Sequence, residues 1–102
     1  MEKQATAILE LLGNSYPSAI KSPFITEQTG YNGAIIRKTI NFLRSLGYPI
    51  CSSRSGYYLS QDKEEIKKTI HNLESRQETI QRAVEGLKLS LKDREMEVYE
   101  VR

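Results

Sequence analysis

Basic and amide side chains recur along the stretch from 32 to 46. At about 100° per residue, Lys38 and Asn41 fall on one side of a helix drawn through this stretch, and Arg37 and Arg44 lie on its flank. This side carries no Asp or Glu. Lysine and arginine side chains bind phosphates, and amides can hydrogen-bond to base edges. The chemistry open to these residue types is contact with a nucleic acid, although taken alone they are better explained as an ordinary solvated helix face.

The opposite side of the same stretch is apolar and would hold the helix in place. Apolar residues recur there at four- and three-residue steps, at Ile36, Ile40, Leu43 and Leu46. Asn32 can cap the start of the helix, and Gly47 can adopt the left-handed conformation that ends it. The sequence thus predicts a helix over 32–46 with one buried and one polar, basic face.

A short β-hairpin is expected directly after this helix. Residues 50–53 alternate, a tight turn is expected near Arg54-Ser55-Gly56, and an aromatic strand follows at 57–59. Arg54 would stand at the hairpin tip, and Cys51 is expected to be a small, partly buried strand residue. A helix that presents cations, followed by a hairpin with a cation at its tip, is the layout of a winged helix.

Two further helices are expected upstream. The first should run from Glu2 to Leu12 and end at Gly13. The second should begin with Ser22 as N-cap and Pro23 at the first helical position, bury Phe24 or Ile25, and end at Thr29-Gly30. Two helices joined by a short turn containing glycine form a helix-turn-helix. The predicted fold is mainly α with a small β-hairpin.

Residues 8–59 resemble the N-terminal winged helix-turn-helix domain of the biotin-ligase repressors and related bacterial winged-helix regulators. The shared pattern is Thr29-Gly30, then Ile36-Arg-Lys-Thr-Ile40-Asn-Phe-Leu43-Arg44-Ser-Leu-Gly47, then Gly56-Tyr57-Tyr58-Leu59. The resemblance implies DNA binding with the third helix in the major groove. The chain departs from the pattern at Tyr31-Asn32-Gly33, where the family has a Ser-Arg pair, so a base preference is not carried over. It has no room for a ligase domain, so no biotin chemistry is implied.

A second stretch, 62–92, predicts a long coiled-coil helix. Asp62 is the expected N-cap, and Glu65 would complete a capping box. A heptad seam, in which residues follow one another at alternating steps of four and three, comprises Ile66, Ile70, Leu73, Gln77, Ile80, Val84, Leu87 and Leu91. A seam this long favours dimerisation with an identical chain; parallel and antiparallel pairing both remain open. Residues 93–102 are expected to form a tail, in which Met96–Val98 could alternatively be an edge strand.

Charge and composition reduce the number of function classes that the chain could belong to. The net charge is +2, yet residues 1–61 hold six Lys or Arg against three acids. The single cysteine excludes an intrachain disulfide, and no apolar run approaches the length of a membrane span, which predicts a soluble cytoplasmic protein. His71 has no ligand partner at metal spacing, and no catalytic set or phosphate loop is recognisable, so neither an enzyme nor a metal or other cofactor is expected.

Two classes of function remain. The first is a homodimeric, sequence-specific double-stranded DNA-binding protein, such as a small bacterial or phage transcriptional regulator, bound to an inverted repeat. Its interface would comprise Asn32, Arg37, Lys38, Asn41, Arg44 and Arg54. The alternative is a winged-helix interaction adaptor, or a phage replication or packaging accessory protein, whose coiled coil binds another subunit.

Overall fold

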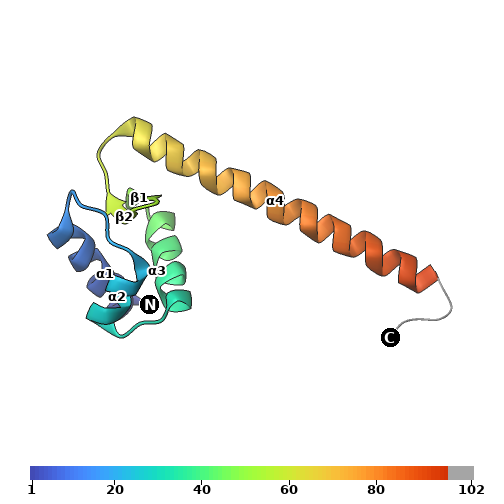
Figure 1. Cartoon of the computed structure of the whole chain (residues 1–102), viewed down its shortest axis with the longest axis horizontal. Coiled ribbons are helices and arrows are strands. Elements are labelled where there is room, and N and C mark those ends of the chain that lie inside the picture. Colours follow the sequence, from blue (N-terminus) through green and yellow to red (C-terminus); the bar gives the residue numbers. More distant parts are fainter. Residues whose placement is uncertain (97–102) are drawn as a thin grey trace. The chain divides into compact units, whose positions relative to one another are not determined.

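The computed structural model describes residues 1–96 and divides the chain into two units, Met1–Thr69 and Ile70–Arg102. The chain is mainly helical, with one two-stranded antiparallel hairpin (Figure 1). Its elements, in order, are α1 (Glu2–Ser15), α2 (Ser22–Thr29), α3 (Gly33–Ser45), β1 (Ile50–Ser53), β2 (Gly56–Leu59) and α4 (Lys63–Met96). The predicted order of three helices, a hairpin and a long helix is confirmed.

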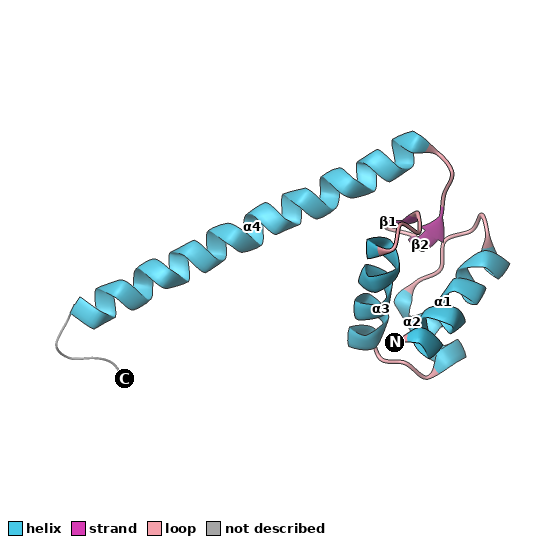
Figure 2. Ribbon diagram, turned by 180° about the vertical axis from the view of Figure 1, so that it is seen from behind, coloured by secondary structure: helices cyan, strands magenta, loops and turns pink. Residues whose placement is uncertain are grey.

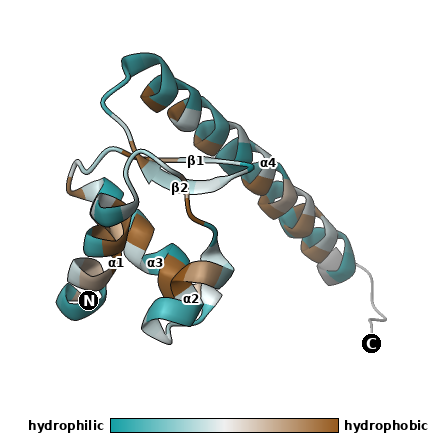
Figure 3. Ribbon diagram, turned by 60° about the vertical axis from the view of Figure 1, so that its left-hand side comes forward, coloured by the Kyte–Doolittle hydropathy of each residue, from teal (hydrophilic) through white to brown (hydrophobic). Residues whose placement is uncertain are grey.

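The core of the first unit lies between the apolar faces of α1, α2 and α3, and the hairpin closes it. Figure 3 shows these apolar faces turned toward one another. The buried cluster comprises Ala5, Ile8, Leu12, Ile25, Ile36, Ile40, Leu43 and Ile50. Each face follows from helical spacing, which places residues three or four apart on one side.

Helix α1 is longer than expected. It continues through Gly13 to Ser15, so the prediction that Gly13 ends it is wrong. Gly13 keeps a negative φ, and the Ser15 hydroxyl donates to the Leu11 carbonyl at 2.6 Å, which extends the last turn.

Helix α2 begins one residue earlier than expected. Lys21 is its N-cap residue and Ser22 is already helical, so Ser22 is not the cap. The cause is an antiparallel bridge in which the backbones of Ile20 and Tyr57 exchange hydrogen bonds of 2.9 and 2.8 Å, which holds the chain extended up to Lys21. Of the two apolar candidates, Ile25 is buried and Phe24 is exposed. Gly30 ends the helix with φ 81°, as predicted.

Helix α3 has the predicted cap. The Asn32 side-chain oxygen accepts from the Ile35 backbone N–H at 2.9 Å. Ile36, Ile40 and Leu43 are buried, but Leu46 is 61% exposed, so its assignment to the buried face is wrong. Leu46 follows the last helical residue, at the turn where Gly47 has φ 98°, and therefore lies beyond the helical face that is buried.

The hairpin pairs Ile50 with Leu59 and Ser53 with Gly56, around the predicted turn (Figure 2). It is covered more fully than the sequence indicated, because Cys51 is completely rather than partly buried. The start of α4 belongs to this unit: the buried Thr69 hydroxyl accepts from the Ser52 backbone N–H at 3.4 Å. The first unit therefore includes the first two turns of α4.

Asp62 caps α4 as predicted, since its carboxylate accepts from the Glu64 backbone N–H at 2.8 Å. The capping box does not form. The Asp62 N–H donates to the Ser60 hydroxyl, which in turn donates to Glu65. The helix continues to Met96, so this residue of the alternative edge strand is helical. The other two residues of that strand and the rest of the tail lie outside the described residues.

Candidate nucleic-acid interface

The outward face of α3 carries the amide and cationic side chains that the sequence singled out. Asn32, Arg37, Lys38 and Asn41 are all exposed, and so is Ala34 between them. Lys38 and Asn41 lie opposite the buried Ile36, because the helix turns about 100° per residue. Arg37 lies on the flank of that face, and Asn32 is the N-cap residue before the first turn. One capped helix thus presents four of the six predicted interface residues together.

The cations of this face are not neutralised within the protein. Across residues 1–96, the salt bridges are Lys67–Glu64 and Arg82–Glu78, both on α4, and neither Arg37 nor Lys38 forms one. A Cβ added at Gly33 would lie 3.4 Å from an Arg37 guanidinium nitrogen, so Arg37 folds back over the first turn of α3. This places a positive charge beside the positive end of the helix dipole, an arrangement that attracts anions.

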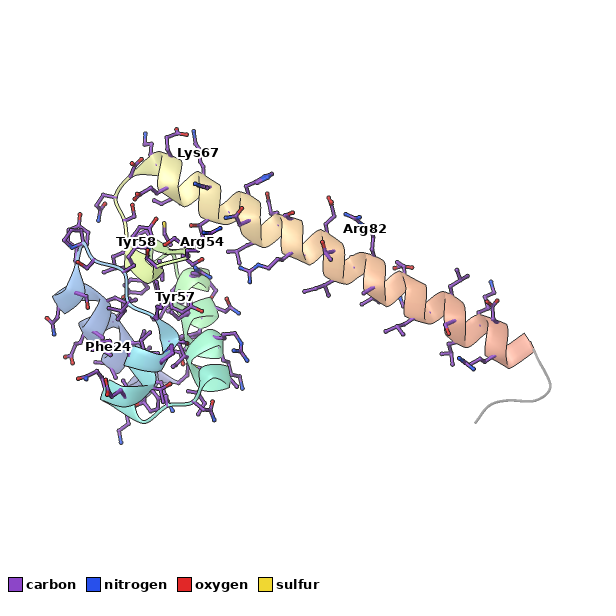
Figure 4. All side chains as sticks on the ribbon, viewed as in Figure 1. Phe24, Arg54, Tyr57, Tyr58, Lys67 and Arg82 are labelled. Atoms are coloured by element: carbon purple, nitrogen blue, oxygen red, sulfur yellow. The ribbon has the colours of Figure 1, made fainter. Side chains whose placement is uncertain are left out.

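Arg54 lies at the exposed hairpin turn, apart from the α3 residues along the chain (Figure 4). The turn is shaped by Ser53, whose hydroxyl accepts from the Ser55 backbone N–H at 3.1 Å. In the part of the chain that the structure describes, Arg54 forms no salt bridge. The hairpin therefore offers a third cation, separate from Arg37 and Lys38, to the same kind of ligand.

Arg44 lies in a different setting from the other predicted interface residues. Its Nε donates to the Ile50 carbonyl at 2.8 Å, and an Nη donates to the Ser52 hydroxyl at 3.3 Å. Its guanidinium carbon lies 5.9 Å from the centre of the Tyr57 ring, within cation–π range. The side chain is half-buried and joins the last turn of α3 to both strands of the hairpin. Helical angle alone places Arg44 on the flank of α3 but does not reveal this contact.

Two apolar side chains that the sequence analysis did not single out border the polar face of α3. Ile35 and Phe42 are 36% and 38% exposed. They are seven residues apart and so lie on one side of the helix. Their spacing is visible in the sequence, but only the structure shows that this side lies outside the core.

A shallow cleft elsewhere in the first unit has the opposite electrostatic character. It encloses about 450 Å³ beside the β2–α4 connection, and its lining includes Tyr16, Tyr58, Asp62 and Glu65 but no Lys or Arg. The pKa of the Tyr58 hydroxyl is raised above its ordinary value of 10.0. Burial is the largest cause, followed by electrostatic interaction with Glu65, Cys51 and Asp62. The acidic lining makes this cleft a poor site for a nucleic acid.

The predicted dimerisation residues lie along one side of α4, and most of them belong to the second unit. Ile70, Ile80, Val84, Leu87 and Leu91 are 38–72% exposed, while Ile66 and Leu73 are half-buried. Figure 3 shows the apolar bands recurring along the helix. An exposed apolar seam of this length is a candidate interface with another chain.

Within residues 1–96 no group of three or more His, Cys, Asp or Glu is placed to hold a metal ion. No described helix combines the length and the apolar character that crossing a membrane requires. Comparison of the chain with protein-family models, curated proteins and solved structures found no match.

Proposed function

We propose that residues 1–61 form a winged helix-turn-helix domain and that the chain is a homodimeric, sequence-specific double-stranded DNA-binding protein, a small bacterial or phage transcriptional regulator. The observation that carries this proposal is the exposed face of α3. It holds Arg37 and Lys38 without an acid on the helix or a salt-bridge partner in the described chain. An acid-free, uncompensated face suits a polyanion.

In this proposal the start of α3 enters the major groove. Asn32, Lys38 and Asn41 lie nearest the base edges, where amides and ammonium groups can hydrogen-bond. Arg37 contacts phosphate, and Arg54 reaches the adjacent minor groove or its phosphates from the hairpin tip. Arg44 has a positioning role instead of the phosphate contact expected from its helical angle, because its guanidinium is engaged by the hairpin.

In this proposal the apolar seam of α4 forms the dimer interface. A two-fold dimer would present two α3 helices to one duplex, so the site should be an inverted repeat. Half-site centres should lie about 10 base pairs apart or a multiple of that. A single domain with few cations makes few phosphate contacts, so dimerisation is what raises affinity and specificity.

The exposed Ile35 and Phe42 favour a second candidate function, a protein-interaction adaptor. Apolar side chains on the rim of α3 would suit the groove of a partner protein. In that case the cations of α3 would be a solvated surface, and affinity for duplex DNA would be weak and independent of Lys38.

A matched pair of charge reversals separates the two functions. Lys38→Glu and Lys3→Glu each change the net charge equally, and both side chains are exposed, one on α3 and one on α1. In fluorescence anisotropy with a labelled duplex, Lys38→Glu should weaken binding by about tenfold or more, because it places a carboxylate against the DNA, whereas Lys3→Glu should have a small effect. Circular dichroism should show both variants folded.

Two results would contradict the proposal. One is a folded Lys38→Glu protein with wild-type affinity at ~150 mM salt, where nonspecific binding is already weak. The other is an equal loss of affinity in both variants. Selection of bound sequences from a random pool, repeated with Asn41→Ala, should further show relaxed preference at one base pair of each half-site.

A further inference from the structure

The geometry of the α4 seam points to one mode of pairing: we propose that α4 binds a second copy of itself in parallel and in register. This inference rests on the homodimer of the proposed function. The seam in the second unit is apolar and open, with Ile80 63% and Leu87 72% exposed. Parallel and antiparallel pairing would both cover it, and two features of the seam distinguish them.

The first feature is Gln77, the one polar residue among the eight seam positions. In a heptad written abcdefg the seam consists of the a and d positions, and the a positions here are Ile70, Gln77, Val84 and Leu91. In an antiparallel coil each a residue packs against a d residue of the other helix. The d positions of the seam are Ile66, Leu73, Ile80 and Leu87, so every antiparallel register that sets Gln77 against the seam buries its amide against an aliphatic side chain. In a parallel coil a residues pack against each other, and two Gln77 amides can donate to and accept from one another. A buried amide needs such a partner.

The second feature is the charge at the edges of the seam. Antiparallel pairing with full overlap places Lys67 beside Lys88 of the second copy, and does so twice in the dimer. In parallel, the facing edge pairs are Thr69 with Glu74, Arg76 with Gln81, and Ala83 with Lys88. None of these pairs joins like charges, so the parallel arrangement avoids the repulsion.

Shifting the antiparallel register by one heptad does not remove the conflict. A shift in one direction sets Glu74 against Glu74 of the second copy and Gln77 against Leu73. A shift in the other direction leaves Ile66 and Ile70 without a partner among the eight seam positions and sets Gln77 against Leu87. Only the parallel, in-register dimer satisfies Gln77, avoids like charges and covers the whole seam.

The consequence for DNA binding is geometric. In a parallel coil the two N-terminal units are joined to the same end of the coil. Both copies of α3 are then available to one duplex, whereas an antiparallel coil would join them to opposite ends. The parallel dimer therefore suits an inverted repeat on one duplex.

Disulfide trapping in the full-length chain tests the orientation. The native Cys51 is buried and is replaced by Ala, and this background must sediment as the wild type does. Ile70→Cys is then oxidised in a glutathione buffer alone, and also after mixing with a mass-tagged Leu87→Cys chain. In a parallel dimer the two thiols introduced at position 70 are neighbours, while thiols at positions 70 and 87 are separated by about 25 Å along the helix.

We expect Ile70→Cys to form covalent dimers with itself, and the mixture to form dimers between like chains only. Disulfides that join an Ile70→Cys chain to a Leu87→Cys chain would overturn the parallel assignment, as would a sedimenting dimer in which neither pair crosslinks. A monomer at ~100 µM by sedimentation would contradict the homodimer itself, and DNA binding measured on the same sample would show whether the interface proposal survives.

Discussion

Arg44 donates from Nε to the carbonyl of Ile50 at 2.8 Å, so the last turn of α3 holds the first residue of β1. The same guanidinium donates to Ser52 and lies over Tyr57 on the second strand. This side chain thus links the hairpin, and with it Arg54, directly to the helix proposed to enter the groove.

Arg44→Lys should therefore destabilise the first unit although it keeps the charge. A lysine lacks the planar fork that donates to two acceptors at once. We expect the free energy of unfolding in urea to fall by about 1.5–3 kcal/mol, the range for hydrogen bonds to charged groups. Arg37→Lys is the matched control and should leave stability unchanged. Equal stability of both variants would show that the Arg44 contacts do not hold the hairpin.

A second prediction concerns Gly56, at the turn side of β2. It has φ +121°, and a Cβ placed there would lie 2.2 Å from the Ile20 carbonyl oxygen. Gly56→Ala should lower the free energy of unfolding by about 2–4 kcal/mol, because both the backbone and the bridge to Ile20 must shift. Gly86→Ala on α4 meets nothing within 4 Å and should stabilise the helix by up to about 1 kcal/mol. Near-ultraviolet circular dichroism during heating would report the first change and far-ultraviolet circular dichroism the second.

The sequence predicted the elements whose signals are local. The spacing of Ile36, Ile40 and Leu43, the Asn32 cap and the glycine at position 30 each act within a few residues, and the structure confirms them. The error at the start of α2 arises where distant segments meet. The start of α2 depends on the Ile20–Tyr57 bridge, a pairing across 37 positions that no local pattern indicates.

The same limit applies to the candidate site. The exposure of Lys38 and Asn41 follows from helical angle, which the sequence contains. The engagement of Arg44 depends on where the hairpin packs, and the complete burial of Cys51 depends on how that unit packs around it. Contacts of this kind require the tertiary structure.

A third prediction concerns pH. The raised pKa of Tyr58 means that the folded state holds the phenolic proton more tightly than the unfolded chain, whose ordinary pKa is 10.0. Above that pH the unfolded state binds fewer protons, so the free energy of unfolding should fall as pH rises further. Below it, this group should contribute no pH dependence. Urea unfolding between pH 8 and about 11 should show a shallower fall in Tyr58→Phe than in the wild type; identical slopes would contradict the assignment.

A fourth prediction tests the seam. Replacing Leu73 and Ile80 by Asp would place four carboxylates in the dimer interface, and the chain should become monomeric by sedimentation because buried charges are costly. Ser75→Asp with Leu89→Asp adds the same charge at outward positions and should remain dimeric. Specific DNA binding should be lost only in the first double variant, while its N-terminal unit stays folded. Dimers in both variants would place the interface elsewhere.

The most direct measurement of the central proposal is an amide chemical-shift map of the ¹⁵N-labelled protein titrated with a short duplex at low salt. The proposal predicts the largest changes on α3 at Arg37, Lys38 and Asn41 and at the hairpin tip around Arg54, and predicts that they diminish as salt is raised. An unchanged spectrum, or changes confined to α1 and the acidic cleft beside Tyr58, would contradict the assignment of α3 as a DNA-binding helix.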